Sequence, residues 1–223
     1  MLEDVREEFD RRSDEIDTLY SHISAIDLEP NEGLRSTSSG LISILASSLC
    51  LMLYNQVEST AFSCVEAIYD GVHQKRVSFN NLVPGFKKKI LSDCRQAYHS
   101  VESLMGGLQN NDISEVIAKT SLKLDKVFSG NVDARRLREV LANYHLIVTA
   151  PSPLNQGAEL LSLKTARNSL AHGSASFEKY GRSLTVSDLN NLRENIREYM
   201  SHVIRLTESY LVSEAYLAPV SAA

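Results

Sequence analysis

The strongest constraint on the fold is a long stretch without charge in the first third of the chain. No Asp, Glu, Lys or Arg occurs between Arg35 and Glu58, and residues 41–54 are mostly apolar. This apolar part is only 14 residues long and includes serines, whereas a helix needs about 20 apolar residues to cross a bilayer. We therefore predict that it forms the central core helix of the protein and does not span a membrane.

Along most of the remaining chain, apolar residues recur at intervals of three and four, which is the period of an amphipathic helix. Only five Pro and ten Gly occur among 223 residues, so few positions interrupt these patterns. Weaker patterns over 110–131 predict short helical pieces, and the apolar run 146–150 would suit a lone strand, although no nearby segment pairs with it. The predicted helices cover residues 2 to about 30, about 36–70, 86–104, 133–144, about 156–172 and about 185–210.

Several predicted helix ends carry local signals. The glycines at 106–107 and at Gly173 are expected to end the helices that precede them. Thr185, followed three residues later by Asp188, resembles a capping box with Asp in place of Glu or Gln. Together the patterns predict an all-α, up-and-down helical bundle with short accessory helices, formed by residues 1–223 as a single domain.

The charge is unevenly distributed along the chain. Residues 1–32 carry eleven acidic and three basic side chains, whereas residues 33–223 carry 17 acidic and 20 basic ones. A protein that coats long nucleic acids has a strongly basic face, so any contact with RNA should be local here. We expect the acidic first helix to pack on the bundle or to flank it.

The sequence lacks the usual cofactor and metal motifs. It has no glycine-rich nucleotide loop, no H-E-x-x-H motif and no paired-cysteine spacing, so we expect neither a cofactor nor a bound metal. Three cysteines without C-x-x-C spacing, and no secretion signal after Met1, favour a reduced protein of the cytoplasm.

One candidate for chemistry remains, the heptapeptide Arg-Asn-Ser-Leu-Ala-His-Gly at 167–173. On an ideal helix, Arg167 and His172 are separated by about 140° around the axis, so they converge only if the helix ends there. Gly173 permits such an end. An imidazole that accepts and donates a proton, beside a fixed guanidinium, suits cleavage of RNA by its own 2′-hydroxyl without a metal. The pair alone leaves a plainer interpretation open, a surface Arg and a His that caps the helix.

A second feature lies inside the predicted central helix, where Tyr54, Asn55 and Glu58 fall on one face by their spacing. A buried carboxylate is costly unless it is paired. We predict that Glu58 pairs with Arg167 and fixes it. Asn168 or Tyr54 would complete the hydrogen bonds. The alternative is that this face meets water or a second subunit.

Three segments together carry a family resemblance. They are Leu-Tyr-Asn-Gln-Val-Glu-Ser-Thr at 53–60, Phe-Ser-Gly-Asn-Val-Asp-Ala-Arg at 128–135, and residues 167–173 followed by Phe177. The combination resembles the HEPN superfamily, helical domains found in prokaryotic toxin, abortive-infection and CRISPR-associated ribonucleases. It is similar to one stand-alone HEPN family assigned to conflict or toxin systems, and the resemblance covers most of the chain.

The hallmark of this superfamily is an Arg, usually followed by a polar residue, then four to six residues and a His. The resemblance therefore implies that Arg167, Asn168 and His172 are catalytic. It also implies an RNA substrate, a homodimer with a composite cleft, products with a 2′,3′-cyclic phosphate end, and an antitoxin or other regulatory protein as a partner. Some HEPN toxins have a Tyr two residues after the His that an antitoxin modifies, but Ser174 occupies that position here.

Around this centre we expect Tyr54, Asn55 and Lys164 to contact the RNA. The basic runs at 87–89 and 135–138 would steer RNA toward the cleft or, alternatively, form ordinary solvated faces. The sequence thus predicts a metal-independent endoribonuclease that acts as a toxin or phage-defence effector. The alternatives are a non-catalytic HEPN scaffold that binds a partner protein or nucleotide, and a plain helical dimerisation module.

Overall fold

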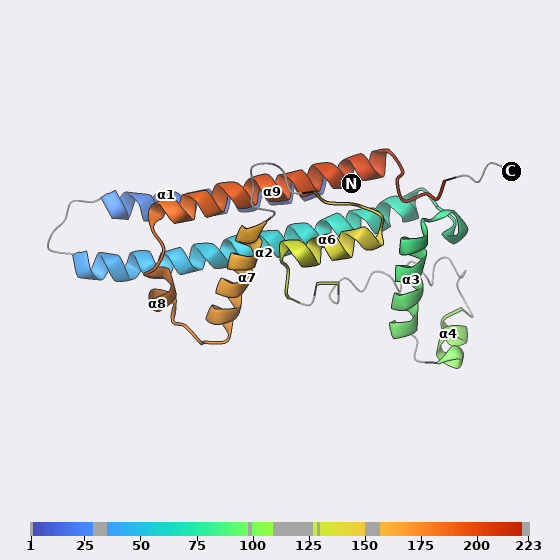
Figure 1. Cartoon of the computed structure of the whole chain (residues 1–223), viewed down its shortest axis with the longest axis horizontal. Coiled ribbons are helices and arrows are strands. Elements are labelled where there is room, and N and C mark those ends of the chain that lie inside the picture. Colours follow the sequence, from blue (N-terminus) through green and yellow to red (C-terminus); the bar gives the residue numbers. More distant parts are fainter. Residues whose placement is uncertain are drawn as a thin grey trace.

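The computed structural model describes residues 2–28, 35–97, 100–108, 127–128, 130–149 and 157–219. Three long helices lie side by side and form the body of the protein (Figure 1): α1 (Leu2–Leu28), α2 (Arg35–Gln74) and α9 (Val186–Val212). α1 runs antiparallel to both α2 and α9. Across the described ranges, residues 146–149 included, the chain forms helices and an isolated bridge but no strand. The prediction of an all-α bundle is confirmed.

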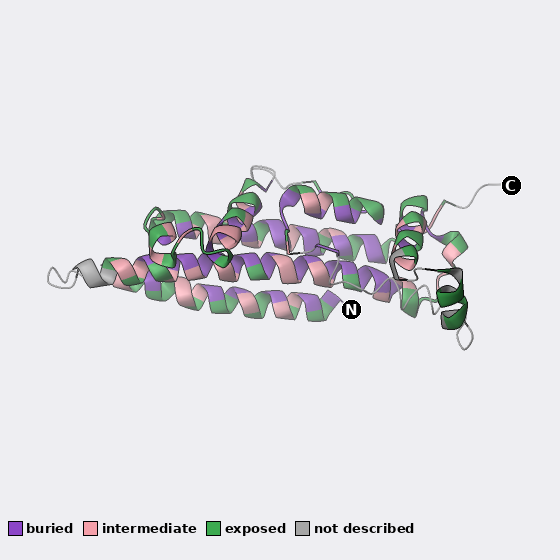
Figure 2. Ribbon diagram, turned by 90° about the horizontal axis from the view of Figure 1, so that it is seen from below, coloured by how far each residue is buried: buried purple, intermediate pink, exposed green. Residues whose placement is uncertain are grey.

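α2 is the central helix, and its apolar composition is the reason. It packs against α1, α7 (Ala158–Ala171), α8 (Phe177–Gly181) and α9. Ser39–Gln74 is long and apolar enough to cross a membrane by length and composition alone, and half of its most apolar 18-residue stretch is buried inside the protein. Figure 2 shows that the buried residues concentrate along the three long helices.

Polar contacts fix how α1 is rotated against its two neighbours. Gln56 of α2 is only 2% exposed, and its Nε2 donates to the Ser13 hydroxyl at 2.7 Å and to the Phe9 carbonyl oxygen at 3.2 Å. Asp17 of α1 accepts a hydrogen bond from Arg193 of α9 at 2.6 Å. Because a buried amide is costly to leave unpaired, Gln56 also determines which face of α2 turns toward α1.

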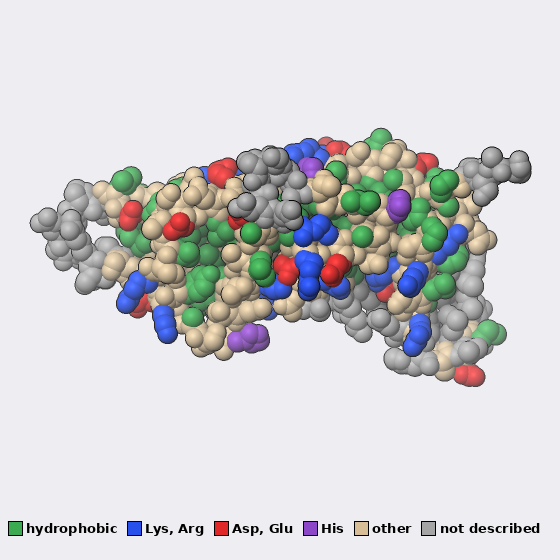
Figure 3. Space-filling view, viewed as in Figure 1, with side chains coloured by type: hydrophobic (Ala, Val, Ile, Leu, Met, Phe, Trp, Pro, Cys, Tyr) green, Lys and Arg blue, Asp and Glu red, His purple; other side chains and the backbone are tan. Residues whose placement is uncertain are grey.

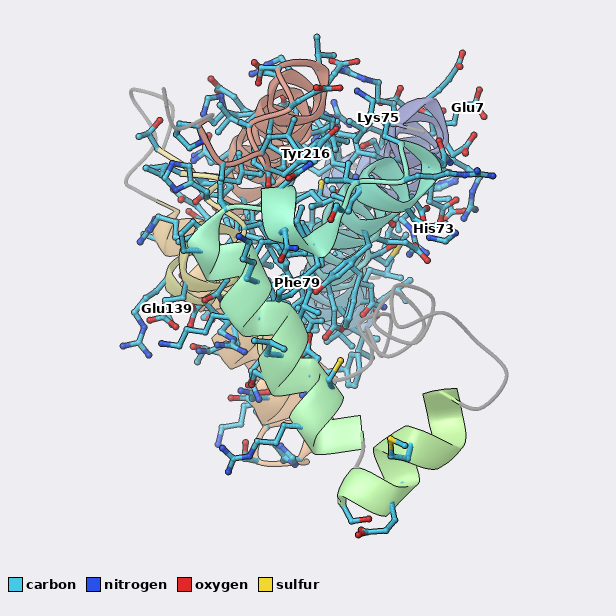
Figure 4. The ribbon with its side chains drawn as sticks, turned by 90° about the vertical axis from the view of Figure 1, so that its right-hand side faces the viewer. Glu7, His73, Lys75, Phe79, Glu139 and Tyr216 are labelled. Carbon is cyan, nitrogen blue, oxygen red and sulfur yellow. The ribbon has the colours of Figure 1, made fainter. Side chains whose placement is uncertain are left out.

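η1 (Phe79–Asn81), α3 (Pro84–Ala97) and α4 (Val101–Leu108) lie at one end of the bundle, which Figure 4 views directly. α6 (Ala134–Asn143) lies between α7 and α3 along the length of the bundle (Figure 1). An aromatic cluster joins α3 and the end of α6 to the long helices. Tyr69 of α2, Phe86 of α3 and Tyr144 after α6 pack edge to face with ring centroids 4.9 to 5.6 Å apart. Tyr210 of α9 donates to the Tyr144 carbonyl oxygen at 2.5 Å.

The prediction of one helix over 86–104 is wrong, because the structure has two helices there, α3 and α4. α4 begins after Ser100, whose hydroxyl accepts a hydrogen bond from the Ser103 N–H at 3.1 Å. The apolar period continues across the break, so periodicity did not reveal it. The glycines at 106–107 lie inside α4 and do not close a helix. The weak pattern predicted over 110–131 falls largely outside the described residues.

The short helix α8, which Ser176 caps, was not predicted from the sequence. Gly181 at its end lies directly against the backbone of α2, since a Cβ there would be 1.8 Å from the Ser43 carbonyl oxygen. Ser47 of α2 donates from its hydroxyl to the Phe177 carbonyl oxygen at 2.6 Å. α8 therefore docks on α2 through a close approach that glycine makes possible.

We expect Gly181→Ala to destabilise the protein by about 2–3 kcal/mol, because the added methyl group overlaps backbone that cannot move aside easily. Urea denaturation measures the change in the free energy of unfolding. Gly106→Ala is the matched control, since a Cβ there meets nothing within 4 Å. Equal stability of the two variants would contradict the close packing of α8 on α2.

Candidate active site

The geometry of the candidate site begins with the way α7 ends. His172 is the C-cap residue, and Gly173 follows it with φ +69°. The Gly173 N–H donates to the Leu170 carbonyl oxygen at 3.3 Å. The Ser174 N–H donates to the Ser169 carbonyl oxygen at 3.0 Å. These two bonds form a Schellman motif, whose left-handed residue is best supplied by glycine, so the predicted helix end is confirmed.

Arg167 lies on α7, and its guanidinium is turned toward the backbone that precedes α6. Nη1 donates to Asn168 Oδ1 at 3.1 Å, and Cζ lies 5.6 Å from the centroid of the Tyr54 ring. A Cβ on Gly130 would lie only 3.1 Å from Nη2. The guanidinium of this half-buried residue is therefore held between α7, α2 and the Gly130 backbone.

Tyr54 of α2 is fully buried and bridges two backbone groups. Its hydroxyl donates to the Gly130 carbonyl oxygen at 2.8 Å and accepts a hydrogen bond from the Val132 N–H at 3.1 Å. Burial raises the pKa of the Tyr54 phenol and the Glu58 carboxylate adds to the rise, while the Val132 N–H and the Arg167 charge oppose it. Tyr54 therefore keeps its proton at neutral pH. The expected contact between Tyr54 and RNA does not fit its burial.

Glu58 lies near Arg167 but does not form the direct ion pair predicted from the sequence. Its Oε1 would be 3.9 Å from the same Cβ position on Gly130. Although both side chains belong to the described residues, no ion pair joins them. Glu58 is only partly buried, so burial does not force it to take a cationic partner. Asn55 is exposed and makes no side-chain hydrogen bond to any described residue, whereas the adjacent Tyr54 is buried.

Lys164 of α7 forms an ion pair with Asp133, the N-cap residue of α6. Asp133 Oδ1 also accepts a hydrogen bond from the Arg136 N–H at 2.8 Å. Burial alone would raise the pKa of Asp133, but the Lys164 ammonium and the Arg136 N–H hold that pKa below its ordinary value. The ion pair ties α7 to α6, and the predicted contact of Lys164 with RNA would have to compete with it.

His172 is exposed at the end of α7. Its backbone N–H donates to the Asn168 carbonyl oxygen at 3.0 Å, while its imidazole makes no hydrogen bond to any residue that the structure describes. Within one chain, therefore, no hydrogen bond joins the imidazole to Arg167. Ser174 donates from its hydroxyl to the Ser169 carbonyl oxygen at 3.1 Å, so this side chain reinforces the helix end.

The two basic runs are partly engaged in local contacts. Lys and Arg side chains gather over α6 with acidic side chains among them (Figure 3). The side chain of Arg135 is 82% exposed, and its Nε lies 3.7 Å from Oε1 of Glu139. In the other run, Lys87 donates to a backbone carbonyl and Lys89 forms an ion pair with Asp93. The alternative of a solvated face therefore accounts for several of these residues.

A cavity of about 270 Å³ lies elsewhere, at the end of the bundle seen in Figure 4. Its wall includes Gly71 of α2, which is about 20 Å along the helix from Glu58, so the cavity does not belong to the Arg167 site. Its other lining residues are Leu2, Lys75, Glu208, Leu211, Val212 and Tyr216. Within the described ranges, no group of three or more His, Cys, Asp or Glu side chains is placed to hold a metal ion.

Sequence reasoning missed three residues of the site: Gly130, Asn131 and Asp133. Asn131 is exposed, and its Oδ1 accepts a hydrogen bond from Asn168 Nδ2 at 3.5 Å. All three belong to the segment 128–135 that carried the resemblance, where adjacent Gly and Asn residues are typical of a turn. What the sequence did not reveal was the surface of α2 and α7 on which this turn packs.

An all-α bundle with Arg167 and His172 at the end of one helix is the architecture that the resemblance implied. A family model described as HEPN_MAE_28990-like HEPN matches residues 1–216. The chain belongs to this HEPN family, and HEPN domains generally include ribonucleases. A comparison with curated proteins and another with solved structures gave no match.

We expect Asp133→Asn to destabilise the protein by about 1–2 kcal/mol at pH 7, because Asn still caps α6 but cannot pair with the Lys164 charge. The pKa of Asp133 is lowered in the folded protein, so this stability is present above the ordinary Asp pKa of about 3.9 and is lost as the pH falls through the folded value. Urea denaturation of both proteins between pH 7 and about pH 3 measures how the difference shrinks.

Lys164→Met is the matched control for this prediction. It should show the same loss at pH 7, and the double variant should lose little more than either single one. A difference between parent and Asp133→Asn that stays constant over the whole pH range would contradict the ion pair.

Proposed function

We propose that the chain is a metal-independent endoribonuclease in which Arg167 and His172 are the catalytic residues. The observation that best supports this is the contrast between the two groups on α7. The guanidinium is held by Asn168, Tyr54 and the Gly130 backbone, whereas the imidazole stands exposed at the helix end. A fixed cation beside an accessible acid and base is what cleavage of a phosphodiester requires.

In the proposed reaction, the His172 imidazole removes the proton from a ribose 2′-hydroxyl. The oxygen attacks the adjacent phosphorus, the bond from phosphorus to the 5′-oxygen breaks, and that oxygen takes a proton from an imidazolium. The products end in a 2′,3′-cyclic phosphate and a 5′-hydroxyl. Arg167 binds the negatively charged oxygens on the phosphorus through those guanidinium N–H bonds that Asn168 does not use. Asn168 orients the guanidinium through its Oδ1.

The proposed active form is a homodimer with a composite centre. Within one chain the His172 imidazole makes no hydrogen bond to Arg167, and Arg167 is turned toward α2 and Gly130. A two-fold axis near the end of α7 would let the guanidinium of one protomer and the imidazole of its partner meet over one phosphate. RNA is the substrate because it alone carries the 2′-hydroxyl nucleophile.

We also propose a role as a toxin or phage-defence effector in the cytoplasm, held in check by an antitoxin or another regulatory protein. Membership of the HEPN family supports this role. Ser174 already donates its hydroxyl to the end of α7, so any silencing would use a group other than a tyrosine at that position.

We expect the purified protein to cleave RNA in EDTA, and Arg167→Ala or His172→Ala to slow cleavage by about 10²-fold or more. Each change removes a group that acts in the transition state. Gel electrophoresis of labelled RNA gives the rates, and chemical analysis of the new ends should find the cyclic phosphate. Arg205→Ala and His73→Ala are the matched controls, since both residues are exposed and lie outside the site.

Equal cleavage by the parent and by both site variants would mean a contaminant or another site. If the parent does not cleave RNA, and His172→Ala strongly lowers the melting temperature, the motif at 167–173 serves to stabilise the structure. That result would favour the non-catalytic HEPN scaffold.

We expect a mixture of Arg167→Ala and His172→Ala protomers to regain activity, although each variant alone is inactive. In a mixed dimer with a composite centre, one of the two centres keeps both intact residues, so the equilibrated mixture should recover about a quarter of the parent rate. Denaturing and refolding the two variants together, followed by the RNA assay, measures it. If the mixture stays as inactive as its components, both residues act within one chain.

A further inference from the structure

The segment at 130–133, which we name the Gly130 segment, is held in place at both of its ends. At one end, the Tyr54 hydroxyl bonds the Gly130 carbonyl oxygen at 2.8 Å and the Val132 N–H at 3.1 Å. At the other end, Asp133 caps α6 and pairs with Lys164 of α7. The segment is thus fastened to α2 by neutral hydrogen bonds and to α7 by an ion pair. It cannot move without breaking buried contacts.

Glycine at position 130 satisfies two separate requirements. Its φ is +69°, a conformation that L side chains rarely adopt. In addition, a Cβ there would lie 3.1 Å from Arg167 Nη2 and 3.9 Å from Glu58 Oε1. The space that a side chain would occupy is thus filled by the guanidinium of Arg167.

The guanidinium of Arg167 also contacts Tyr54 and Asn168. The Tyr54 ring lies 5.6 Å from Cζ, within the range of a cation–π contact, and Asn168 Oδ1 accepts from Nη1 at 3.1 Å. Asn168 in turn donates to Asn131 of the Gly130 segment at 3.5 Å. An arginine side chain has many rotamers, and these contacts select one of them before any substrate binds.

We propose that the Gly130 segment, clamped by the Tyr54 hydroxyl, is the seat that positions the Arg167 guanidinium for transition-state binding. Tyr54, Gly130 and Asp133 are then positioning residues, which act through Arg167 and do not touch the RNA. This inference rests on the proposed ribonuclease function for its kinetic consequence, but the seat itself is a property of the protein without RNA. A displacement of the guanidinium by about 1 Å is enough to cost a large part of the rate.

Tyr54→Phe is the decisive variant, because it keeps the ring beside the guanidinium and removes only the hydroxyl that clamps the segment. We expect kcat for RNA cleavage to fall about tenfold or more while KM changes little. A displaced guanidinium weakens mainly the binding of the transition state and has little effect on the binding of the substrate. Gly130→Ala should have the same effect. Tyr69→Phe is the matched control: Tyr69 is a buried tyrosine of α2 whose hydroxyl pairs with that of Tyr144, about 22 Å along the helix from Tyr54.

A second readout needs no enzymatic activity. Phenylglyoxal modifies accessible arginines, and mass spectrometry of the labelled peptides gives the rate at Arg167. We expect this rate to rise several-fold in Tyr54→Phe and Gly130→Ala, and to equal the parent rate in Tyr69→Phe, even though Tyr69→Phe lowers the melting temperature.

The outcomes separate the seat from the proposed function. If labelling of Arg167 increases in Tyr54→Phe and Gly130→Ala but the parent does not cleave RNA, the positioning of Arg167 by the Gly130 segment is supported and the ribonuclease function is contradicted. Cleavage by the parent, with unchanged kcat and labelling in Tyr54→Phe, would overturn the seat alone. Equal effects of Tyr54→Phe and Tyr69→Phe would also overturn it, because general loss of stability would then explain both.

Discussion

The burial of α2 is the constraint on which the rest of the structure depends. A helix with so little charge in its first half must be covered on most sides, and α1, α7, α8 and α9 supply that cover. The buried Gln56 amide, bonded to α1, sets the rotation of α2. Glu58 lies two residues later, about 200° further around the axis, so the same helix presents its opposite face to the candidate site.

Backbone geometry, more than charge, shapes the site. Gly173 ends α7 in a Schellman motif and leaves His172 exposed as the C-cap residue. Gly130 supplies a left-handed position and the space that the Arg167 guanidinium fills. Gly181 allows α8 to approach the backbone of α2. At each position a larger residue would be strained or would overlap a neighbour. The geometry of the site therefore requires glycine at these three positions, in addition to its polar side chains.

The cations near the site are used in different ways. Lys164 is neutralised by Asp133 and serves to join α7 to α6. Arg167 is oriented by a neutral amide and an aromatic ring, and no carboxylate among the described residues forms an ion pair with it. Its positive charge therefore remains available to a phosphate, which is the property that an arginine needs for binding a phosphorane-like transition state.

Local sequence patterns by themselves determined the core helix, the capping box at Thr185 and the end of α7, because each depends on periodicity or cap chemistry within a few residues. They failed at the break before α4, where the apolar period continues across two helices. Tertiary structure alone decided that Arg167 meets Gly130 and that Lys164 pairs with Asp133, 31 residues away. Contacts of this kind arise from how α6 and α7 pack on α2, and no local pattern encodes that packing.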